Sequence, residues 1–274
     1  MERRLNDLMS GAKKAALLGR DVLLHYFKDI KHISEKAKAG LVSEADTTSE
    51  EVIIHFLKEA FPEIGFIAEE DSFKKKKLSW EQERQTGKFW IIDPLDGTTN
   101  YIYGFPVYCI SIGLFLEGQT KLGVIDVPSL KTTYTAIKGE GAYKNDIPIE
   151  VSQRKMLEES LLATGFYHED EPFLEEQIKI FSQLVKKARG IRRAGAAAFD
   201  LCMVAEGVFD AYWERNLKPW DTCAGELLVR EAGGVVTTYE GSPYSPFGSS
   251  ILSGNALVHK ELLEVIRPIV VPSS

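Results

Sequence analysis

Two aspartates stand close together in the segment WIIDPLDGTTN, residues 90–100. The apolar run FWII before them is typical of a buried strand, so we expect Asp93 at its carboxyl end, where sheet-based active sites commonly open. Pro94 fixes a corner and cannot donate a backbone hydrogen bond, so nearby carbonyls, including that of Leu95, can face an ion. Asp96 is close enough to share a cation with Asp93 or to hold a second one. This oxygen-rich set suits Mg²⁺ far better than Zn²⁺.

The residues that follow, Gly97, Thr98 and Thr99, can turn the backbone into a helix N-terminus, whose free N–H groups attract phosphate. An Asp-Gly pair after an apolar run is also what an ordinary turn looks like. Rival motifs do not fit. An EF-hand loop counted from Asp93 is broken at Leu95 and Gly97, and the D-x-x-D spacing differs from the D-x-D of haloacid dehalogenases. The chain has no P-loop and no GxGxxG.

Two other acidic positions are candidates to complete a metal cluster. Glu69 and Glu70 follow the strand-like run IGFIA, and Asp221 follows KPW where a helix should begin. Taken singly, a solvated turn is the favoured interpretation of the glutamates, and a helix cap that of Asp221. Taken together with the D-x-x-D segment, they favour a metal site.

Three segments occur in an order and at separations that resemble the signatures of the inositol monophosphatase family: IAEED, WIIDPLDGTTNYIYGFP and YWERNLKPWDTCAGELLVREAGG. The similarity covers essentially the full length and includes LVSEAD near the start and GIRRAGAAAFDLCMVAEGVFDAYWE before the last signature. The resemblance implies an α/β (α+β) layered αβαβα sandwich, a Mg²⁺-dependent and lithium-sensitive phosphatase, and a homodimer.

The resemblance also implies roles for matching residues. The predicted ligands of two or three Mg²⁺ ions are Glu69, Asp93, the carbonyl of Leu95, Asp96 and Asp221, with Asp93 bridging. Thr98, backed by Asp46 and helped by Glu69, is expected to orient the attacking water. The N–H groups of Gly97 and Thr98 are expected to hold the phosphate. Gly195, Ala197 and Glu214 are expected to face the alcohol part of the substrate.

The substrate is less well defined than the reaction. The run YWERNLKPWD favours a myo-inositol phosphate, whereas similar families cleave fructose 1,6-bisphosphate, 3'-phosphoadenosine 5'-phosphate or histidinol phosphate. Gly40, Ala68 and Ala196 depart from the commoner family pattern. Ala196 replaces a frequent serine or threonine near the substrate pocket, which leaves the sugar or polyol preference open. A binding or regulatory protein that keeps the fold is the alternative from another class.

The elements that must position these residues can be read from periodicity. We expect an amphipathic helix near 5–29, and a second one that begins after Asp46 with a Thr48–Glu51 capping box and ends at Pro62. Short apolar runs between 64 and 145 predict a mostly antiparallel sheet. The charged piece 72–87 is interpreted as a solvated loop or hairpin.

From residue 171 onward, the pattern alternates between helices and strands, with helices near 172–189, 196–207 and 219–234 and a last one at the C-terminus. We therefore expect two lobes fused tightly as one unit: an α+β lobe over 1–150 that carries the metal-binding motifs, and an α/β lobe over 151–274 that completes the active site.

Composition limits the class of protein. The chain has 274 residues, 44% of them hydrophobic, and a formal net charge of −7 with scattered lysines and arginines, so nucleic acid is an unlikely partner. Three widely spaced cysteines make no disulfide framework, which is typical of a cytoplasmic protein. No apolar run approaches the length of a membrane span.

Overall fold

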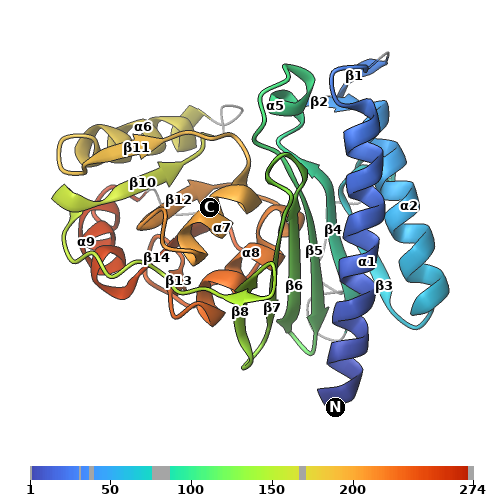
Figure 1. Cartoon of the computed structure of the whole chain (residues 1–274). Coiled ribbons are helices and arrows are strands. Elements are labelled where there is room, and N and C mark those ends of the chain that lie inside the picture. The colour runs from blue at the N-terminus through green and yellow to red at the C-terminus, as the bar shows by residue number, and fades with distance from the viewer. Residues whose placement is uncertain (1, 31, 37–39, 76–86, 167–170, 271–274) are drawn as a thin grey trace.

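The structure is a computed structural model that describes the chain except for residues 1, 31, 37–39, 76–86, 167–170 and 271–274. Its elements stack as helices, a sheet, helices, a second sheet and helices (Figure 1). The predicted α/β layered αβαβα sandwich is confirmed. In the described residues, no helix is both long and apolar enough to cross a membrane.

The first sheet has seven strands in the order β3-β4-β5-β6-β7-β8-β9. Adjacent strands in this sheet are antiparallel except β3 and β4, which run parallel to each other. The predicted mostly antiparallel sheet is therefore confirmed. The strands are β3 Gly65–Ala68, β4 Lys88–Asp96, β5 Cys109–Leu116, β6 Gln119–Val127, β7 Thr132–Ile137, β8 Gly141–Lys144 and β9 Ile147–Pro148.

Helices α1 (Glu2–Tyr26) and α2 (Glu44–Ala60) cover the outer face of this sheet, and a small hairpin of β1 (Ile33–Lys36) and β2 (Gly40–Ser43) lies between them in the chain. The predicted capping box of α2 is wrong. Ser43 is the N-cap and pairs reciprocally with Asp46, whereas the Thr48 hydroxyl donates to the Glu44 carbonyl inside the helix. Both tetrapeptides fit the capping pattern, and the earlier one starts the helix.

Two short helices follow sheet strands in this half, α3 (Glu69–Lys75) after β3 and α5 (Thr98–Ile102) after β4. Residues 72–75 therefore belong to a helix, not to the predicted loop, and residues 76–86 of that prediction lie outside the described residues. Glu69 and Glu70 begin α3, so the interpretation of this pair as a solvated turn is wrong; Glu70 is only 4% exposed.

The second sheet has five strands in the order β11-β10-β12-β14-β13. It is mixed, because β10 is parallel to β11 and β12 while β14 is antiparallel to β12 and β13. The strands are β10 Leu161–Thr164, β11 Gly190–Arg192, β12 Ala211–Arg215, β13 Val235–Thr237 and β14 Ser250–Gly254. Helices α6 (Glu171–Leu184) and α9 (Ala256–Ile266) cover its outer face, and α6 ends five residues earlier than predicted. Short 3₁₀ turns are η1 Pro128–Leu130 and η2 Leu157–Glu159.

Helices α7 (Ala197–Ala205) and α8 (Pro219–Glu231) form the middle layer between the sheets (Figure 1). Every residue of α7 is buried, as expected of a helix whose residues are all apolar except Asp200. Close approach of α8 to the first sheet depends on glycine: a Cβ on Gly113 would lie 2.5 Å from Cys223 Sγ, and one on Gly123 would lie 2.8 Å from the Ala224 carbonyl. The N-termini of both middle helices point toward the end of β4, where the candidate site lies.

Candidate active site

Strand β4 carries Asp93 and continues to Asp96, with a register shift between them opposite β5. The strand therefore does not end at Asp93; the expected corner is this irregularity inside the strand. Asp93 is 2% exposed and accepts a hydrogen bond from the Leu95 N–H at 3.0 Å. Asp96 accepts one from the Ala198 N–H at 2.7 Å. Because Ala198 lies in the first turn of α7, Asp96 joins the first sheet to the middle layer.

Gly97 makes the turn from β4 into α5. Its φ is +92°, and an added Cβ would lie 2.9 Å from the Val107 carbonyl, so both conformation and space require glycine. Thr98 then begins α5, and its hydroxyl lies 2.9 Å from Asp46 Oδ1 and 3.1 Å from the Leu95 carbonyl oxygen. The predicted neighbours Asp46, Leu95 and Thr98 thus lie together.

Glu69 and Asp221 come from separate elements. Glu69 is the first residue of α3. Asp221 is the third residue of α8, and one of its oxygens accepts the Lys218 N–H at 2.6 Å. Asp221 therefore takes part in capping α8 from inside its first turn and is not the N-cap, which is Lys218. It also lies in the acidic group described next.

Four carboxylates influence one another electrostatically. Burial raises the pKa of Asp93 well above its ordinary value, and the charges of Glu69, Asp96 and Asp221 raise it further. Burial likewise raises the pKa of Asp96 to about 6, with a contribution from Glu69, and raises the pKa of Asp221, with contributions from Asp96 and Glu69. Residues far apart in sequence therefore meet here as a group of like charges.

This group fits a hard divalent cation, because its donors are carboxylate oxygens that repel one another and would be neutralised by such an ion. In the described part of the chain, however, no three His, Cys, Asp or Glu side chains are arranged to hold one metal ion together.

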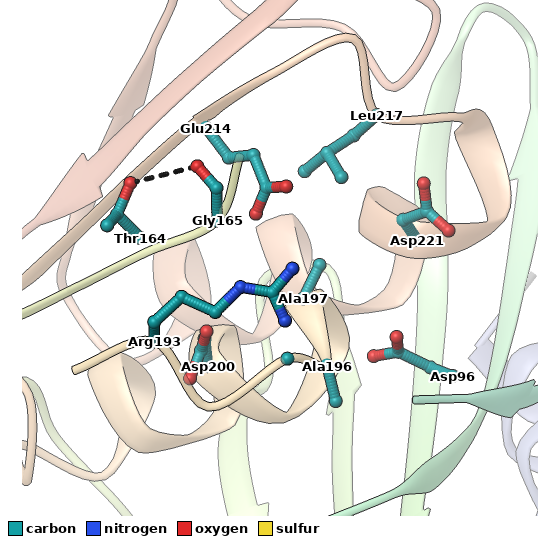
Figure 2. A pocket seen from close by; sticks show the side chains of 11 residues that line it. Asp96, Thr164, Gly165, Arg193, Ala196, Ala197, Asp200, Glu214, Leu217 and Asp221 are labelled. Atoms are coloured by element: carbon teal, nitrogen blue, oxygen red, sulfur yellow. Dashed lines mark hydrogen bonds between the residues drawn. The ribbon is translucent and has the colours of Figure 1, made fainter. Parts of the chain in front are cut away.

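A cavity of about 140 Å³ opens beside Asp96 and Asp221 (Figure 2). At its other end lie Glu214, Arg193 and Asp200. Its lining also includes Thr164, Gly165, Gly195, Ala196, Ala197 and Leu217. Five predicted site residues thus share one cavity: Asp96, Gly195, Ala197, Glu214 and Asp221.

Glu214 projects into the cavity from β12. Burial raises its pKa to about 7, although a hydrogen bond from the Tyr212 hydroxyl and the charge of Arg193 lower it. An added Cβ on Gly165 would lie 2.1 Å from a Glu214 carboxylate oxygen, so Gly165 makes room for this side chain.

Arg193, Asp200 and Gly165 are not among the predicted site residues. Arg193 and Asp200 lie in the segment GIRRAGAAAFD, whose family likeness could have drawn attention to them. Asp200 is 1% exposed, and its Oδ1 accepts no hydrogen bond in the described structure. Burial raises the pKa of Asp200, and Glu214 and Asp96 raise it further.

Asn100 links the two halves of the site. Its side-chain amide donates to the Val107 carbonyl and to the Ala194 carbonyl, each at 2.8 Å. The second bond joins α5, next to the predicted metal-binding segment, to the turn that carries Gly195. One side chain therefore connects α5 to the turn that carries Gly195.

Comparisons with known proteins agree with this geometry. The chain matches the model of the inositol monophosphatase family over residues 5–271. It is 38% identical to an inositol-1-monophosphatase of Synechocystis over 93% of this chain and 87% of that protein. It is 39% identical to the Nus factor SuhB of Pseudomonas aeruginosa over 89% of each. The solved structure of the extragenic suppressor protein suhB of Bartonella henselae superposes with a TM-score of 0.85 at 35% identity, covering 95% of this chain and 98% of that one. The chain therefore belongs to the inositol monophosphatase family, a family of phosphatases.

Proposed function

We propose that this protein hydrolyses the phosphate monoester of a polyol or sugar, with myo-inositol monophosphate as the foremost substrate, by means of Mg²⁺ and an activated water. The observation that carries the proposal is the group of buried, mutually repelling carboxylates beside a cavity lined with polar groups. Cations would neutralise the charge of these carboxylates, and the same cations would offset the negative charge of a phosphate ester.

The chain's residues would hold two or three Mg²⁺ ions through Glu69, Asp93, the Leu95 carbonyl, Asp96 and Asp221. When bound, Mg²⁺ offsets the charge of the ester, activates water near neutral pH and stabilises the departing alkoxide. Asp93 suits a bridging position, because the charges of the three other carboxylates all act on it.

Thr98 and Asp46 would orient the attacking water. When the Thr98 hydroxyl donates to Asp46 Oδ1, its oxygen lone pairs remain available to accept a hydrogen bond from that water. Glu69 assists by accepting a proton. The N–H groups of Gly97 and Thr98 would bind the phosphate. No covalent bond between the protein and the phosphate is required.

The alcohol part of the substrate would lie against Gly195, Ala197 and Glu214. An ionised Glu214 accepts hydrogen bonds from vicinal hydroxyls, which fits a neutral polyol. At the end of the cavity away from Asp96 and Asp221, the described lining contains two acidic residues, Glu214 and Asp200, and one cation, Arg193. Since two acidic groups face one basic group, a leaving alcohol without a second phosphate is the better match.

A phosphatase assay tests this function. The purified chain would be assayed on inositol 1-phosphate, fructose 1,6-bisphosphate and 3'-phosphoadenosine 5'-phosphate, with and without Mg²⁺, and then with added Li⁺. We expect Mg²⁺-dependent and lithium-inhibited release of phosphate, highest with inositol 1-phosphate. Preference for either bisphosphate would reassign the substrate, and trapping of a phospho-aspartate would overturn the direct attack by water.

Three further features accompany the proposal: a homodimer, a cytoplasmic location and no nucleic-acid partner. They rest on the family and on composition. Sedimentation of the purified chain would test the dimer, and fractionation of the source cells would test the location.

A binding or regulatory role is the second candidate, supported by the relative named as a Nus factor. This role would be supported if the folded chain released phosphate from none of the three esters at any Mg²⁺ concentration.

A further inference from the structure

Helix α2 presents three buried polar residues on one face: Asp46, Ser49 and Glu50. Their spacing of three and four residues places them side by side, in line with the apolar residues Ile53 and Leu57 that enter the core. A polar group in this stripe is costly unless it is bonded. Each of the three is bonded, and each bond leads to a different segment of the candidate site.

The hydrogen-bond partners of the three residues lie in α5, β4 and α3. Asp46 accepts a hydrogen bond from the Thr98 hydroxyl at the start of α5. The Ser49 hydroxyl donates to the Pro94 carbonyl in β4 at 3.0 Å. Glu50 reaches α3. One helix thus holds the strand end, the turn and the short helix that carry the candidate ligands Asp93, Asp96 and Glu69.

Glu50 makes two hydrogen bonds to α3, both to its backbone. Its two carboxylate oxygens accept the backbone N–H groups of Glu70 and Asp71, each at 2.8 Å. These N–H groups belong to the first turn of α3, where backbone donors have no partner within the helix. A side chain from another helix therefore satisfies them, and the orientation of the first turn of α3 follows that of α2.

The arrangement keeps a buried acid close to other acids. Burial raises the pKa of Glu50 to about 7, the two backbone hydrogen bonds lower it, and the charges of Glu69 and Asp71 raise it again. Glu50 is 4% exposed, so water does not solvate this carboxylate freely. A local serine or asparagine could cap α3 without that repulsion. What a local cap could not do is fix α3 relative to Asp46 and Ser49.

We propose that Glu50 is a positioning residue for the metal site, which fixes the first turn of α3 and thereby the carboxylate of Glu69 relative to Asp93. The inference rests on the proposed function, because it requires Glu69 to be a Mg²⁺ ligand. Glu50 itself touches neither substrate nor metal. It acts through the backbone of the two residues that follow Glu69.

Titration calorimetry with Mg²⁺ alone tests this without turnover. Glu50→Gln keeps the length of the side chain but loses one of its two acceptors. Glu50→Asp keeps the charge but is one methylene too short to reach both N–H groups. Glu51→Gln is the matched control, since Glu51 lies next along the same helix and is exposed.

We expect both Glu50 variants to bind Mg²⁺ about 10-fold to 100-fold more weakly, as when other outer partners of metal ligands are replaced. The control should stay within about twofold of wild type. The Mg²⁺-induced rise in Tm should shrink in both variants, and kcat at saturating Mg²⁺ should return close to wild type, since Glu50 does not contact the ester.

Unchanged Mg²⁺ affinity in Glu50→Gln and Glu50→Asp would overturn the proposal. So would weaker binding in Glu50→Gln alone, because that result would assign the effect to charge and not to position. Failure of the proposed function looks different: the wild-type chain itself would bind no Mg²⁺ in the same titration.

Discussion

Asp46 and Asp200 occupy similar places in the two halves of the molecule, each in the first turn of a helix and each at most 1% exposed. Their surroundings differ. Asp46 accepts hydrogen bonds from the Ser43 N–H, the Ser43 hydroxyl and the Thr98 hydroxyl, at 2.8, 2.6 and 2.9 Å. Asp200 Oδ1 has no hydrogen-bond partner in the described structure.

The difference extends beyond these two residues. On the metal side of the site, α2 bonds to every segment that carries a candidate ligand from the first sheet. On the alcohol side, Asp200, Arg193 and Glu214 surround open space. A metal site needs ligands held in one geometry before the ion arrives, whereas an alcohol can complete the bonding of its own pocket when it binds. Under the proposed function, the chain is preorganised at the predicted metal ligands and open where the alcohol part of the substrate would bind.

The largest expected effect comes from the metal side. Asp93→Asn should lower kcat/KM for the best ester by at least about 1000-fold, or about 4 kcal/mol, because it removes the charge at the centre of the carboxylate group. Steady-state assays at high Mg²⁺ measure this. Asp29→Asn, which neutralises an exposed aspartate, serves as the control and should leave activity unchanged. More than a tenth of wild-type activity in Asp93→Asn would exclude the bridging role.

Thr98 provides the next test. Thr98→Ala removes the hydroxyl that joins Asp46 to the Leu95 carbonyl, and we expect kcat to fall about 10²-fold to 10⁴-fold, the usual contribution of a positioned proton-transfer group. Thr98→Ser retains the hydroxyl and should recover most of the rate. Single-turnover kinetics at saturating Mg²⁺ separate this from weaker metal binding. Equal rates in the two variants would show that the hydroxyl plays no part.

Measurements of the free energy of unfolding test the difference between Asp46 and Asp200. Asp46→Ala leaves three donors without their acceptor and should lower the free energy of unfolding by about 1–3 kcal/mol. Asp200→Ala removes an oxygen that has no partner and a carboxyl group whose ionised form is disfavoured by burial, Glu214 and Asp96 and favoured only by Arg193, so its effect should stay within about 1 kcal/mol of zero. Urea unfolding of metal-free protein measures both. Equal destabilisation would mean that Asp200 is as well bonded as Asp46.

Sequence reasoning succeeded where the chemistry is local. The segment from Phe89 to Thr98 combines an apolar strand, a proline, a glycine and a helix start, and nearest-neighbour rules predict each of these, although the strand ends three residues later than expected. Asp221 at a helix start is equally local. The layered fold could be predicted because the family resemblance covered the whole chain.

Long-range bonds explain what sequence reasoning missed. Glu50 is a polar residue in an amphipathic helix, which normally indicates the solvent face, and nothing local shows that its partners lie 20 residues further on. The start of α2 is a different case, because Ser43–Asp46 and Thr48–Glu51 both fit the capping pattern and local rules did not choose between them. Asp200 and Arg193 became candidates only once the cavity was known.

The smallest expected effect is the pH dependence of Glu214. Its pKa is about 7 in the folded protein and about 4.3 in an unfolded chain. Between these two pKa values the Glu214 carboxyl group is deprotonated in the unfolded chain but still protonated in the folded protein. This group therefore makes the folded state less stable as pH rises, with no further change above about pH 7. Glu214→Gln removes that contribution. The variant should therefore gain Tm relative to wild type between pH 5 and pH 8, as measured by calorimetry.

The same ionisation should affect substrate binding. Above about pH 7 the Glu214 carboxylate accepts a hydroxyl hydrogen bond, so the KM of wild type should fall about 3-fold relative to Glu214→Gln as pH rises. Tyr212→Phe sharpens the test, because the Tyr212 hydroxyl lowers this pKa and its removal should move the transition to higher pH. A transition that stays at the same pH in Tyr212→Phe would belong to another group, such as the phosphate of the substrate.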